Sequence, residues 1–244
     1  MNRRKPFANR IRQRSNASHF FDWDHATAEK QFRKSIELDP HYAVALGWFA
    51  GFLIDMRRFD EALVYVKRAG EADPRWMEVE TDRGDCYYFS GKTDEAIAVY
   101  LRNLETEPNY GLSRHYLGRA YLAKGQFEEG IVQLRRGNEL LGQVPFSAAD
   151  LGYALGVAGH REEAEKMLSD MMRKRQQGYY PAFAIALIHL GLGHVDAALD
   201  WLERTIDERL PGYYFPSVDP FYNPIRSHPR FHKLMRQMNF DDTK

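Results

Sequence analysis

Two pairs of histidines are spaced as metal ligands can be. His228 and His232 lie four residues apart in "SHPRFHKLM", so their imidazoles would share one face of a helix. His189 and His194 enclose the glycines of "HLGLGH", where they could instead pack against or cap a helix end. A zinc site needs a third and fourth ligand, and the sequence offers none at a matching spacing. We therefore predict no metal site.

The other reactive groups also lack the partners that catalysis needs. Cys86 precedes two tyrosines in a helical pattern, which favours a small packing residue over a reactive thiol. Because it is the only cysteine, an internal disulfide is excluded and a reducing compartment is allowed. We find no glycine-rich phosphate loop, nucleophile-elbow serine or Cys/His zinc spacing. The sequence predicts neither an enzyme nor a bound cofactor.

Charge is balanced overall but not along the chain. Lys plus Arg and Asp plus Glu each number 34, so no global field attracts nucleic acid or an anionic membrane. The first twenty-one residues are basic and contain no acid, which predicts a basic arm at residues 1–8 ahead of an acidic body. The start is polar, and no apolar run is long enough to cross a membrane or to form a signal-peptide core. We expect a cytoplasmic protein without membrane partners.

A period of thirty-four residues organises the chain. Pro40, Pro74 and Pro108 each close a similar run, "ELDP", "EADP" or "ETEP". Small residues recur at the same period: Ala28, Ala62, Ala96, Gly130, Ala164 and Ala198. Large residues follow four positions later: Phe32, Val66, Tyr100, Leu134, Leu168 and Leu202. Glycine recurs at Gly91, Gly125, Gly159 and Gly193. Self-similarity at such a period indicates a stack of structural units.

Each unit has the pattern of two helices. Runs such as "DEALVYVKRA" and "EEAEKMLSDMM" place apolar residues at three- and four-residue spacing, which predicts one buried stripe. The recurring glycine suits the left-handed end of the first helix, and Asp60, Asp94 and Asp196 suit the start of the second. Proline then ends the second helix. The small residues suit close helix crossings, where overpacking costs about 1–3 kcal/mol.

This pattern resembles the tetratricopeptide repeat. Small residues also occupy the centres of the first helices, at Ala50, Gly84, Gly118, Gly152 and Ala186. The resemblance implies an all-α fold, a right-handed α-solenoid of about six 34-residue helix-turn-helix repeats with a C-terminal capping helix. The array would cover residues 9–212, with repeats starting near 9, 43, 77, 111, 145 and 179.

Two regions depart from the family pattern. The first repeat has Arg12, Ser15 and Asn16 where apolar or small residues are expected, and Trp23 where a turn residue is expected. We therefore expect its first helix to be frayed or shortened. In the third repeat Arg83 takes a position that is normally apolar, and we predict that its guanidinium reaches out to an acid such as Glu80.

Residues 213–244 follow the array as an aromatic and proline-rich linker and a helix. We predict that Ser227 caps this helix and that Phe231, Leu234 and Met235 share its apolar side. The helix would cover the exposed flank of the last repeat. The alternative is a helix that binds a partner or a second copy of the chain, so that a homo-oligomer forms through it.

A closer resemblance involves the same region. The stretch "VDPFYNPIRSHPRF" is similar to the end of the C-terminal repeat arrays in bacterial multidomain signalling proteins, among them winged-helix regulators, serine/threonine kinases and adenylate cyclases. In those proteins the array resembles an interaction or sensing module joined to an effector. The sequence has no room for such an effector, so we expect a partner in trans.

The concave face of such an array is the predicted binding surface. We expect it to hold a protein segment, extended or helical, on Tyr88, His115, Arg119, Phe146, Tyr153, Tyr180 and Phe183. Arg119 would be the polar anchor, and Phe146, Tyr153, Tyr180 and Phe183 the apolar ones. The alternative is that these aromatic residues fill the spaces between repeats. Some family members bind a terminal carboxylate through a lysine and an asparagine. Thr81 and Asp85 occupy those places here, so we do not expect this mode of binding.

Three classes of function follow. The first is a protein-interaction scaffold or adaptor in signalling, whose partner is a protein or peptide. The second is a nucleic-acid-binding repeat protein that uses the basic arm, which an acidic body disfavours. The third is an enzyme built on the array, for which the sequence shows no convergent titratable groups. We predict the first.

Overall fold

The computed structural model describes residues 4–20, 22–178, 180–208 and 216–240, with thirteen α-helices, one 3-10 helix and no strand over these residues. The predicted all-α solenoid is therefore confirmed. Residues 1–3 of the predicted basic arm and 213–215 of the predicted linker lie outside the described part. The helix α1 begins at Arg4, so the rest of the predicted arm is helical.

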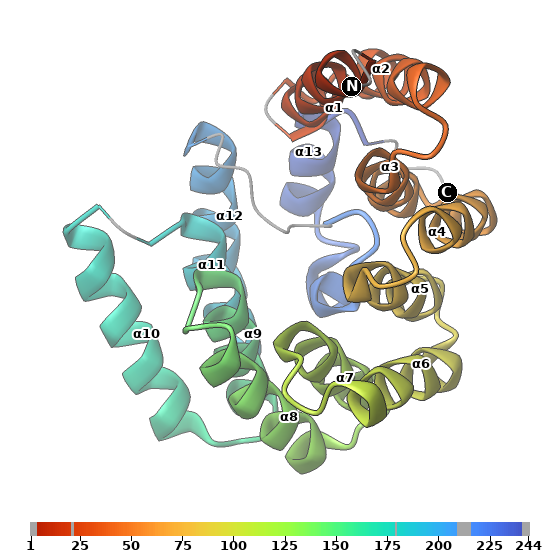
Figure 1. Ribbon diagram of the computed structural model, residues 1–244. Helices are drawn as coiled ribbons and strands as arrows, with labels where there is room; N and C mark the ends of the chain where they lie inside the picture. The colour runs from red at the N-terminus through yellow and green to blue at the C-terminus, as the bar shows by residue number, and fades with distance from the viewer. Residues whose placement is uncertain (1–3, 21, 179, 209–215, 241–244) are drawn as a thin grey trace.

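Twelve of the helices form six consecutive pairs. The pairs are α1 (Arg4–Phe20) with α2 (His25–Leu38), α3 (Ala43–Asp55) with α4 (Phe59–Ala72), α5 (Met77–Phe89) with α6 (Thr93–Thr106), α7 (Gly111–Ala123) with α8 (Phe127–Leu140), α9 (Pro145–Val157) with α10 (Arg161–Gln176), and α11 (Ala182–Gly191) with α12 (Val195–Glu208). The helices of each pair pack on one another, and the pairs follow an arc (Figure 1). The first helices α3, α5, α7, α9 and α11 lie toward the inside of the arc.

Glycine ends the first helix of the last four pairs in the left-handed conformation. Gly91, Gly125, Gly159 and Gly193 have φ angles of +81°, +76°, +87° and +77°. In the first two pairs the same turn position is held by Trp23 and Arg57, with φ angles of +52° and +60°. Left-handed backbone disfavours residues that carry a Cβ, so these two turns are less favourable locally than the four glycine turns.

The small residues lie at close helix crossings, as predicted. All five alanines of the series, Ala28 to Ala198, have no exposed surface, and Gly130 is buried. Opposite Gly130, a Cβ added to Gly118 would lie 2.6 Å from Leu134 Cγ and 2.8 Å from the Gly130 carbonyl oxygen. No side chain fits in that space, so glycine at both positions allows α7 and α8 to pack tightly.

The prediction of a frayed or shortened first helix is wrong. The helix α1 extends over seventeen residues and packs on α2 and α3. Ser15, one of its polar positions, is fully buried and donates its hydroxyl to the Ile11 carbonyl at 3.0 Å. The buried Oδ1 of Asn16 has no hydrogen-bond partner among the described residues. Arg12 lies over the Trp48 ring, 5.8 Å from its centroid. A hydroxyl that bonds to its own helix can be buried at small cost, which apolar periodicity does not register.

The C-terminal segment lies inside the arc. It consists of the 3-10 helix η1 (Pro220–Ile225) and the helix α13 (Pro229–Gln237), and Figure 1 shows it between the first and last helix pairs. The helix α13 packs on α12, as expected for a terminal cap, while η1 contacts α11. The apolar side predicted for α13 is confirmed, since Phe231, Leu234 and Met235 are buried.

The predicted cap of α13 is wrong by one residue. His228, rather than Ser227, is the N-cap, and its Nδ1 accepts a hydrogen bond from the Arg230 amide at 3.2 Å. Pro229 follows immediately in the first turn, where its fixed φ angle favours a helix start. This capping role accounts for His228, which the sequence analysis considered together with His232 as a metal ligand.

The apolar core is divided between two clusters. The N-terminal cluster gathers buried side chains from Ala28 to Ala120, and the C-terminal cluster gathers those from Leu122 to Met238. The C-terminal segment contributes to both, because Val218 belongs to the N-terminal cluster and Phe221 to the C-terminal one. Residues 216–226, which we call the inner segment, therefore join the two halves of the array.

Candidate functional site

The centre of the concave face is built around Arg119 of α7. Its Nη1 donates to Asp150 Oδ2 of α9 at 2.7 Å, and its Nη2 donates to Asp219 Oδ2 of the inner segment at 2.5 Å. All three side chains are buried, with 6%, 2% and 5% of the residue surface exposed. Such charges require partners when they leave water. The guanidinium thus joins the repeats to the inner segment.

Aromatic rings enclose the guanidinium. Its Cζ lies 4.3 Å from the centroid of Phe221 and 5.5 Å from that of Tyr88, both within the range of cation–π attraction. Phe221 in turn stacks on Tyr153 with the ring centroids 4.0 Å apart and the planes 16° from parallel. Phe221 therefore lies between an arginine and a tyrosine of the array, in contact with both.

Asp150 is the fixed counter-ion of this site. The same oxygen that accepts from Arg119 lies 3.0 Å from His115 Nε2, and Phe146 packs edge-on against the His115 ring. Burial alone would raise the pKa of Asp150. The charge of Arg119 and the bond from His115 outweigh burial and hold this pKa below its ordinary value. Asp150 is thus charged and satisfied by the repeats alone.

The second carboxylate on Arg119 is held differently. Asp219 caps η1 by accepting from the Phe221 amide at 2.9 Å, and its other oxygen bonds to Arg119. Burial raises its pKa, and the attraction to Arg119 offsets only part of this shift, so the pKa stays above its ordinary value. Asp150 and Asp219 share Arg119, and the environment of Asp219, in the inner segment, is the less favourable of the two for a charged carboxylate.

A third acid lies one helix away. Asp85 of α5 is buried and accepts a hydrogen bond of 2.6 Å from the Tyr100 hydroxyl. Burial raises its pKa to about 7, against the lowering effects of that bond and of the charge on Arg119. The helix α5 therefore contains a group with a pKa near neutral pH.

The predicted groove residues fall into two sets. The first set consists of Tyr88, His115, Arg119, Phe146 and Tyr153. Tyr88 contacts Arg119 and Phe146 contacts His115, while Asp150 links His115 to Arg119 and Phe221 links Tyr153 to Arg119. Tyr180 and Phe183 are buried in the C-terminal cluster, and Lys174 of α10 lies 5.3 Å from the Tyr180 ring centroid. All except Phe146 are less than 9% exposed, because the chain itself covers them. Their role in binding a partner stays a prediction.

The sequence analysis did not identify Asp150 of α9, nor Asp219 and Phe221 of the inner segment. Asp150 is the only charged residue of α9, "PFSAADLGYALGV", and an isolated charge on an apolar helix is the signal that could have identified it. Asp219 and Phe221 stand in "VDPF", a stretch the sequence analysis connected only with the end of the array. Nothing local relates Asp219 to Arg119, which lies a hundred residues earlier.

The inner segment is also held at its N-terminal side. Ser217 donates its hydroxyl to the Asp55 carbonyl oxygen at 2.6 Å and also lies 3.1 Å from Asp55 Oδ1. Arg57, at the left-handed turn, donates to the Ser217 carbonyl at 3.1 Å. Arg226 donates to the carbonyls of both Ser217 and Asp219, at 2.8 Å each. These bonds fold residues 217–226 into one compact turn on the end of α3.

The end of α13 is fastened by histidines. His19 Nε2 bonds to Asp55 at 2.9 Å, and His19 Nδ1 lies 3.0 Å from His25 Nδ1. His25 Nε2 bonds to the Met238 carbonyl at 2.8 Å. Burial and the nearby His19 lower the pKa of His25. The first helix pair thus holds the far end of the C-terminal segment.

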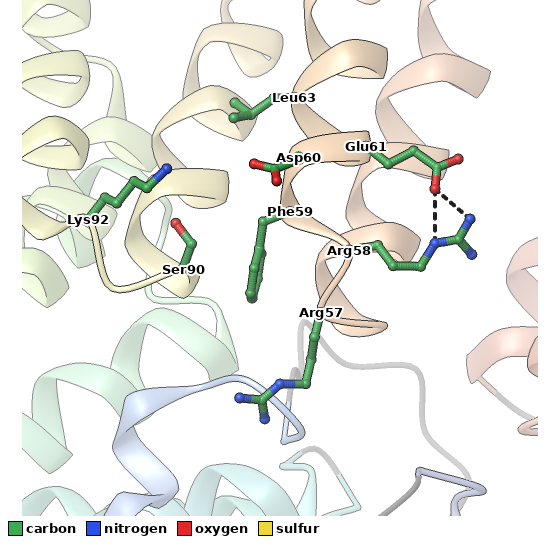
Figure 2. A pocket seen from close by; sticks show the side chains of 8 residues that line it. All are labelled: Arg57, Arg58, Phe59, Asp60, Glu61, Leu63, Ser90 and Lys92. Atoms are coloured by element: carbon green, nitrogen blue, oxygen red, sulfur yellow. Dashed lines mark hydrogen bonds and ion pairs between the residues drawn. The ribbon is translucent and has the colours of Figure 1, made fainter. Parts of the chain in front are cut away.

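A surface cavity of about 400 Å³ opens between the α3–α4 and α5–α6 turns. Figure 2 shows Phe59 in its centre, with Asp60 and Ser90 beside the ring, and Arg58 turned away to pair with Glu61. Arg57 extends from its rim toward the C-terminal segment (Figure 2). The cavity contains none of the predicted groove residues, and its charged rim is already engaged in ion pairs and hydrogen bonds at Arg57, Arg58 and Glu61.

The remaining candidates have structural roles. Cys86 is fully buried, and burial raises its thiol pKa well above the ordinary value, so the thiol is protonated. Arg83 pairs with Glu80 at 3.1 Å, as predicted. His189 and His194 face each other with their Nδ1 atoms 3.4 Å apart. Within the described residues no group of three or more His, Cys, Asp or Glu is placed to hold a metal.

Comparison with known proteins identifies the repeat. Residues 24–80 and 182–204 match family models of the tetratricopeptide repeat. A curated relative, the small glutamine-rich tetratricopeptide repeat-containing protein 2 of Mycosarcoma maydis, is 27% identical over 86 residues, or 35% of this chain. The aligned part covers only 24% of that relative. These two stretches of the chain are therefore similar to tetratricopeptide repeats, and the activity of the longer relative is not carried over.

Solved structures agree on the fold. The type IV pilus biogenesis factor PilW superposes with a TM-score of 0.56 at 18% identity, over 81% of this chain and 91% of PilW. A thermophilic repeat protein from Thermus thermophilus gives 0.54 at 20% identity, over 68% and 90%. One from Parabacteroides merdae gives 0.51 at 14% identity, over 95% and 92%. These likenesses show the fold alone, and the class of the molecule is a helical-repeat solenoid.

Among the residues that the structure describes, no helix is both long enough and apolar enough to span a membrane. The longest of the described helices, α1, contains Arg4, Lys5, Arg10, Arg12 and Arg14.

Proposed function

We propose that this protein is a scaffold or adaptor that holds a segment of a partner protein on its concave face. The observation that carries the proposal is that this face already holds a peptide segment of its own chain. The carboxylate of Asp219 accepts a hydrogen bond from Arg119, and the ring of Phe221 stacks on Tyr153. A surface that orders one short segment through a charged and an aromatic contact has the chemistry to order another.

The contact points match those of strong protein interfaces. A buried charge-assisted bond and a stacked ring lie at the centre, with apolar side chains from both clusters around them. Aromatic anchors and arginines in fully desolvated pockets carry most of the free energy in such interfaces. The helices α5, α7, α9 and α11 would therefore supply the binding surface and the outer helices its support.

We further propose a cytoplasmic role in a bacterial signalling or regulatory system. The support is the similarity of "VDPFYNPIRSHPRF" to the ends of repeat arrays in bacterial multidomain signalling proteins. In this proposal the effector is a separate protein. A homo-oligomer through α13 is the remaining alternative for partnering, although its apolar residues Phe231, Leu234 and Met235 are covered within the chain.

Photo-crosslinking from the two faces of the array tests the proposal. A benzophenone amino acid is placed at Phe146 on the inner face, where the ring is half-buried, and at Val132 of α8, where 61% of the side chain is exposed. In the native cell, position 146 is expected to give a discrete protein adduct that position 132 does not. The adduct should be protease-sensitive and resistant to nuclease.

Three results would overturn the proposal. The first is adducts of equal yield from both positions, the second is adducts from position 132 alone, and the third is an adduct that nuclease removes. Thermal melting of both purified variants, compared with wild type, checks that the label itself leaves the array folded.

A further inference from the structure

We propose that the inner segment, residues 216–226, is a displaceable occupant of the concave face. Its competitor would be a partner segment of the same chemistry, in which an acidic residue is followed by proline and an aromatic residue. This inference rests on the proposed function and names the partner for the same surface. It concerns the inner segment alone, because α13 is anchored by other contacts.

The first argument is that the inner segment sits on the array as a ligand would. Tyr222 stacks on Phe231 of α13, but the groups that fix the centre of the inner segment face side chains of the repeats. Asp219 bonds to Arg119, Phe221 stacks on Tyr153, and Ser217 bonds to Asp55. Asp219 and Phe221 are separated only by Pro220, which fixes φ and limits the chain entropy that a ligand loses on binding.

The second argument is that the opposite charges at the centre of the array stay paired when the inner segment leaves. Arg119 keeps its bond to Asp150, and Asp150 keeps its contact with His115. Neither Arg119 nor Asp150 is left without an opposite charge, which is the condition that normally makes breaking a buried ion pair costly. The carboxylate that leaves is that of Asp219, the less favourably held of the two.

The third argument is that α13 has polar attachments of its own, separate from those of the inner segment. Arg230 of α13 pairs with Asp200 and Glu203 of α12, at 2.6 and 3.0 Å. At the other end of α13, the Met238 carbonyl accepts from His25. The inner segment and α13 also share an apolar contact, because Tyr222 stacks on Phe231 with the ring centroids 5.7 Å apart. Exchange of the inner segment breaks this stacking, while the polar attachments keep α13 on the array, so that the opening is local.

The fourth argument concerns how a partner segment could displace the inner segment. A tethered segment competes at an effective concentration on the order of millimolar, so a partner must make contacts that the tethered segment does not. Two buried atoms offer them, because Arg119 Nε and His115 Nδ1 have no hydrogen-bond partner among the described residues. A partner with a further acceptor beside its acidic residue would use the Arg119 donor.

Peptide binding to the full chain tests the inference. The probe is a fluorescent peptide of residues 216–226, and the chain is compared as wild type and as the double variant Asp219→Ala, Phe221→Ala. Fluorescence anisotropy should show the peptide binding the double variant about tenfold or more tighter than wild type, because the competing segment has lost both anchors. The same two substitutions made in the peptide should abolish binding.

Asn223 supplies the matched control. It is exposed, and among the described residues its side chain bonds only within the inner segment, to Arg226. Asn223→Ala in the peptide should leave its affinity for the double variant unchanged. Arg226→Ala in the chain, which removes the bonds to the Ser217 and Asp219 carbonyls, should give an affinity between wild type and the double variant.

Each remaining outcome counts against the inference. Equal binding to wild type and double variant would place the peptide elsewhere. Absence of binding to a double variant that retains its helical circular dichroism would show that the surface does not take this chemistry. Loss of helical signal in either chain variant would identify the inner segment as an integral part of the fold.

The two proposals fail separately. If the labelled peptide binds the double variant but no protein is crosslinked from position 146, the exchange exists and the scaffold function is wrong. If a protein is crosslinked from position 146 with equal yield in wild type and double variant, the scaffold function stands and the displacement is wrong.

Discussion

Two arginine networks in this molecule have similar distances but very different surroundings. On the outer surface, Arg33 of α2 and Arg58 of α4 pair with Glu29 and Glu61, at 2.5 to 2.9 Å. Between 27% and 41% of each of these side chains is exposed. On the concave face, Arg119 pairs with Asp150 and Asp219 at 2.7 and 2.5 Å, with 3% to 7% exposed.

The difference shows where charge can be used for recognition. Solvent screens the outer pairs, which link α2 to α4 and contribute little free energy each. The inner pairs are shielded from water, so the number and sign of charges around Arg119 matter strongly. Under the proposed function, a partner segment that brings the correct charge to the concave face would be favoured, and one that brings no charge or the opposite charge would be rejected.

Replacing Arg119 should change the free energy of unfolding more than the other substitutions do. Arg119→Met leaves Asp150 and Asp219 buried beside each other without their shared cation, which should reduce the free energy of unfolding by about 3–5 kcal/mol. Urea denaturation followed by circular dichroism measures this. A loss below about 1 kcal/mol, the value usual for exposed pairs, would show that the inner network is as well solvated as the outer one.

An intermediate effect, dependent on pH, is expected at Asp85. Its pKa in the folded protein is raised to about 7, so the folded state favours the protonated form. The stability it contributes is complete below the ordinary pKa of an aspartate, about 4, and is lost as the pH rises toward 7. The free energy of unfolding of Asp85→Asn should therefore rise relative to that of wild type across this range, by about 2–4 kcal/mol at pH 8.

The measurement is the difference in unfolding free energy between Asp85→Asn and wild type from pH 4 to pH 8. Taking the difference removes the opposite trend expected from His25, whose lowered pKa favours the neutral form as the pH rises. A difference that does not change with pH would mean that Asp85 is charged throughout, as an outer carboxylate is.

The smallest effect is expected at the outer network. Arg33→Met removes bonds to Glu29 and Glu61, while Arg58 still forms an ion pair with each of these acids. The expected loss is about 0.2–1 kcal/mol, and it should shrink further in high salt. Urea denaturation at low and high salt checks this. A loss comparable with that of Arg119→Met would remove the distinction between the two networks.

The repeat architecture could be predicted because it is periodic. The spacing of Ala28, Ala62 and their successors, and the glycines from Gly91 onward, follow from contacts between neighbours in the chain. Local physics also fixed the pairing of Arg83 with Glu80, three residues apart on one helix. Five of the seven predicted groove residues come together, because first-helix positions on one face of a solenoid converge.

The position of the C-terminal segment could not be predicted in this way. Arg119 and Asp219 are a hundred residues apart, and no periodicity relates them. The terminal-cap interpretation identified the apolar side of α13 but not that η1 would lie on the concave face. The first helix was misjudged for a related reason, since the satisfied hydroxyl of Ser15 is a matter of hydrogen bonding that hydropathy does not record.

The C-terminal segment also affects the mechanics of the array. A linear stack of repeats bends easily, because each unit contacts only its neighbours. Here α13 connects the two ends, through Arg230 to α12 and through Met238 to His25 of the first pair. The ends cannot move apart without breaking one of these attachments, so the curvature of the array is set by a cross-brace as well as by the helix crossings.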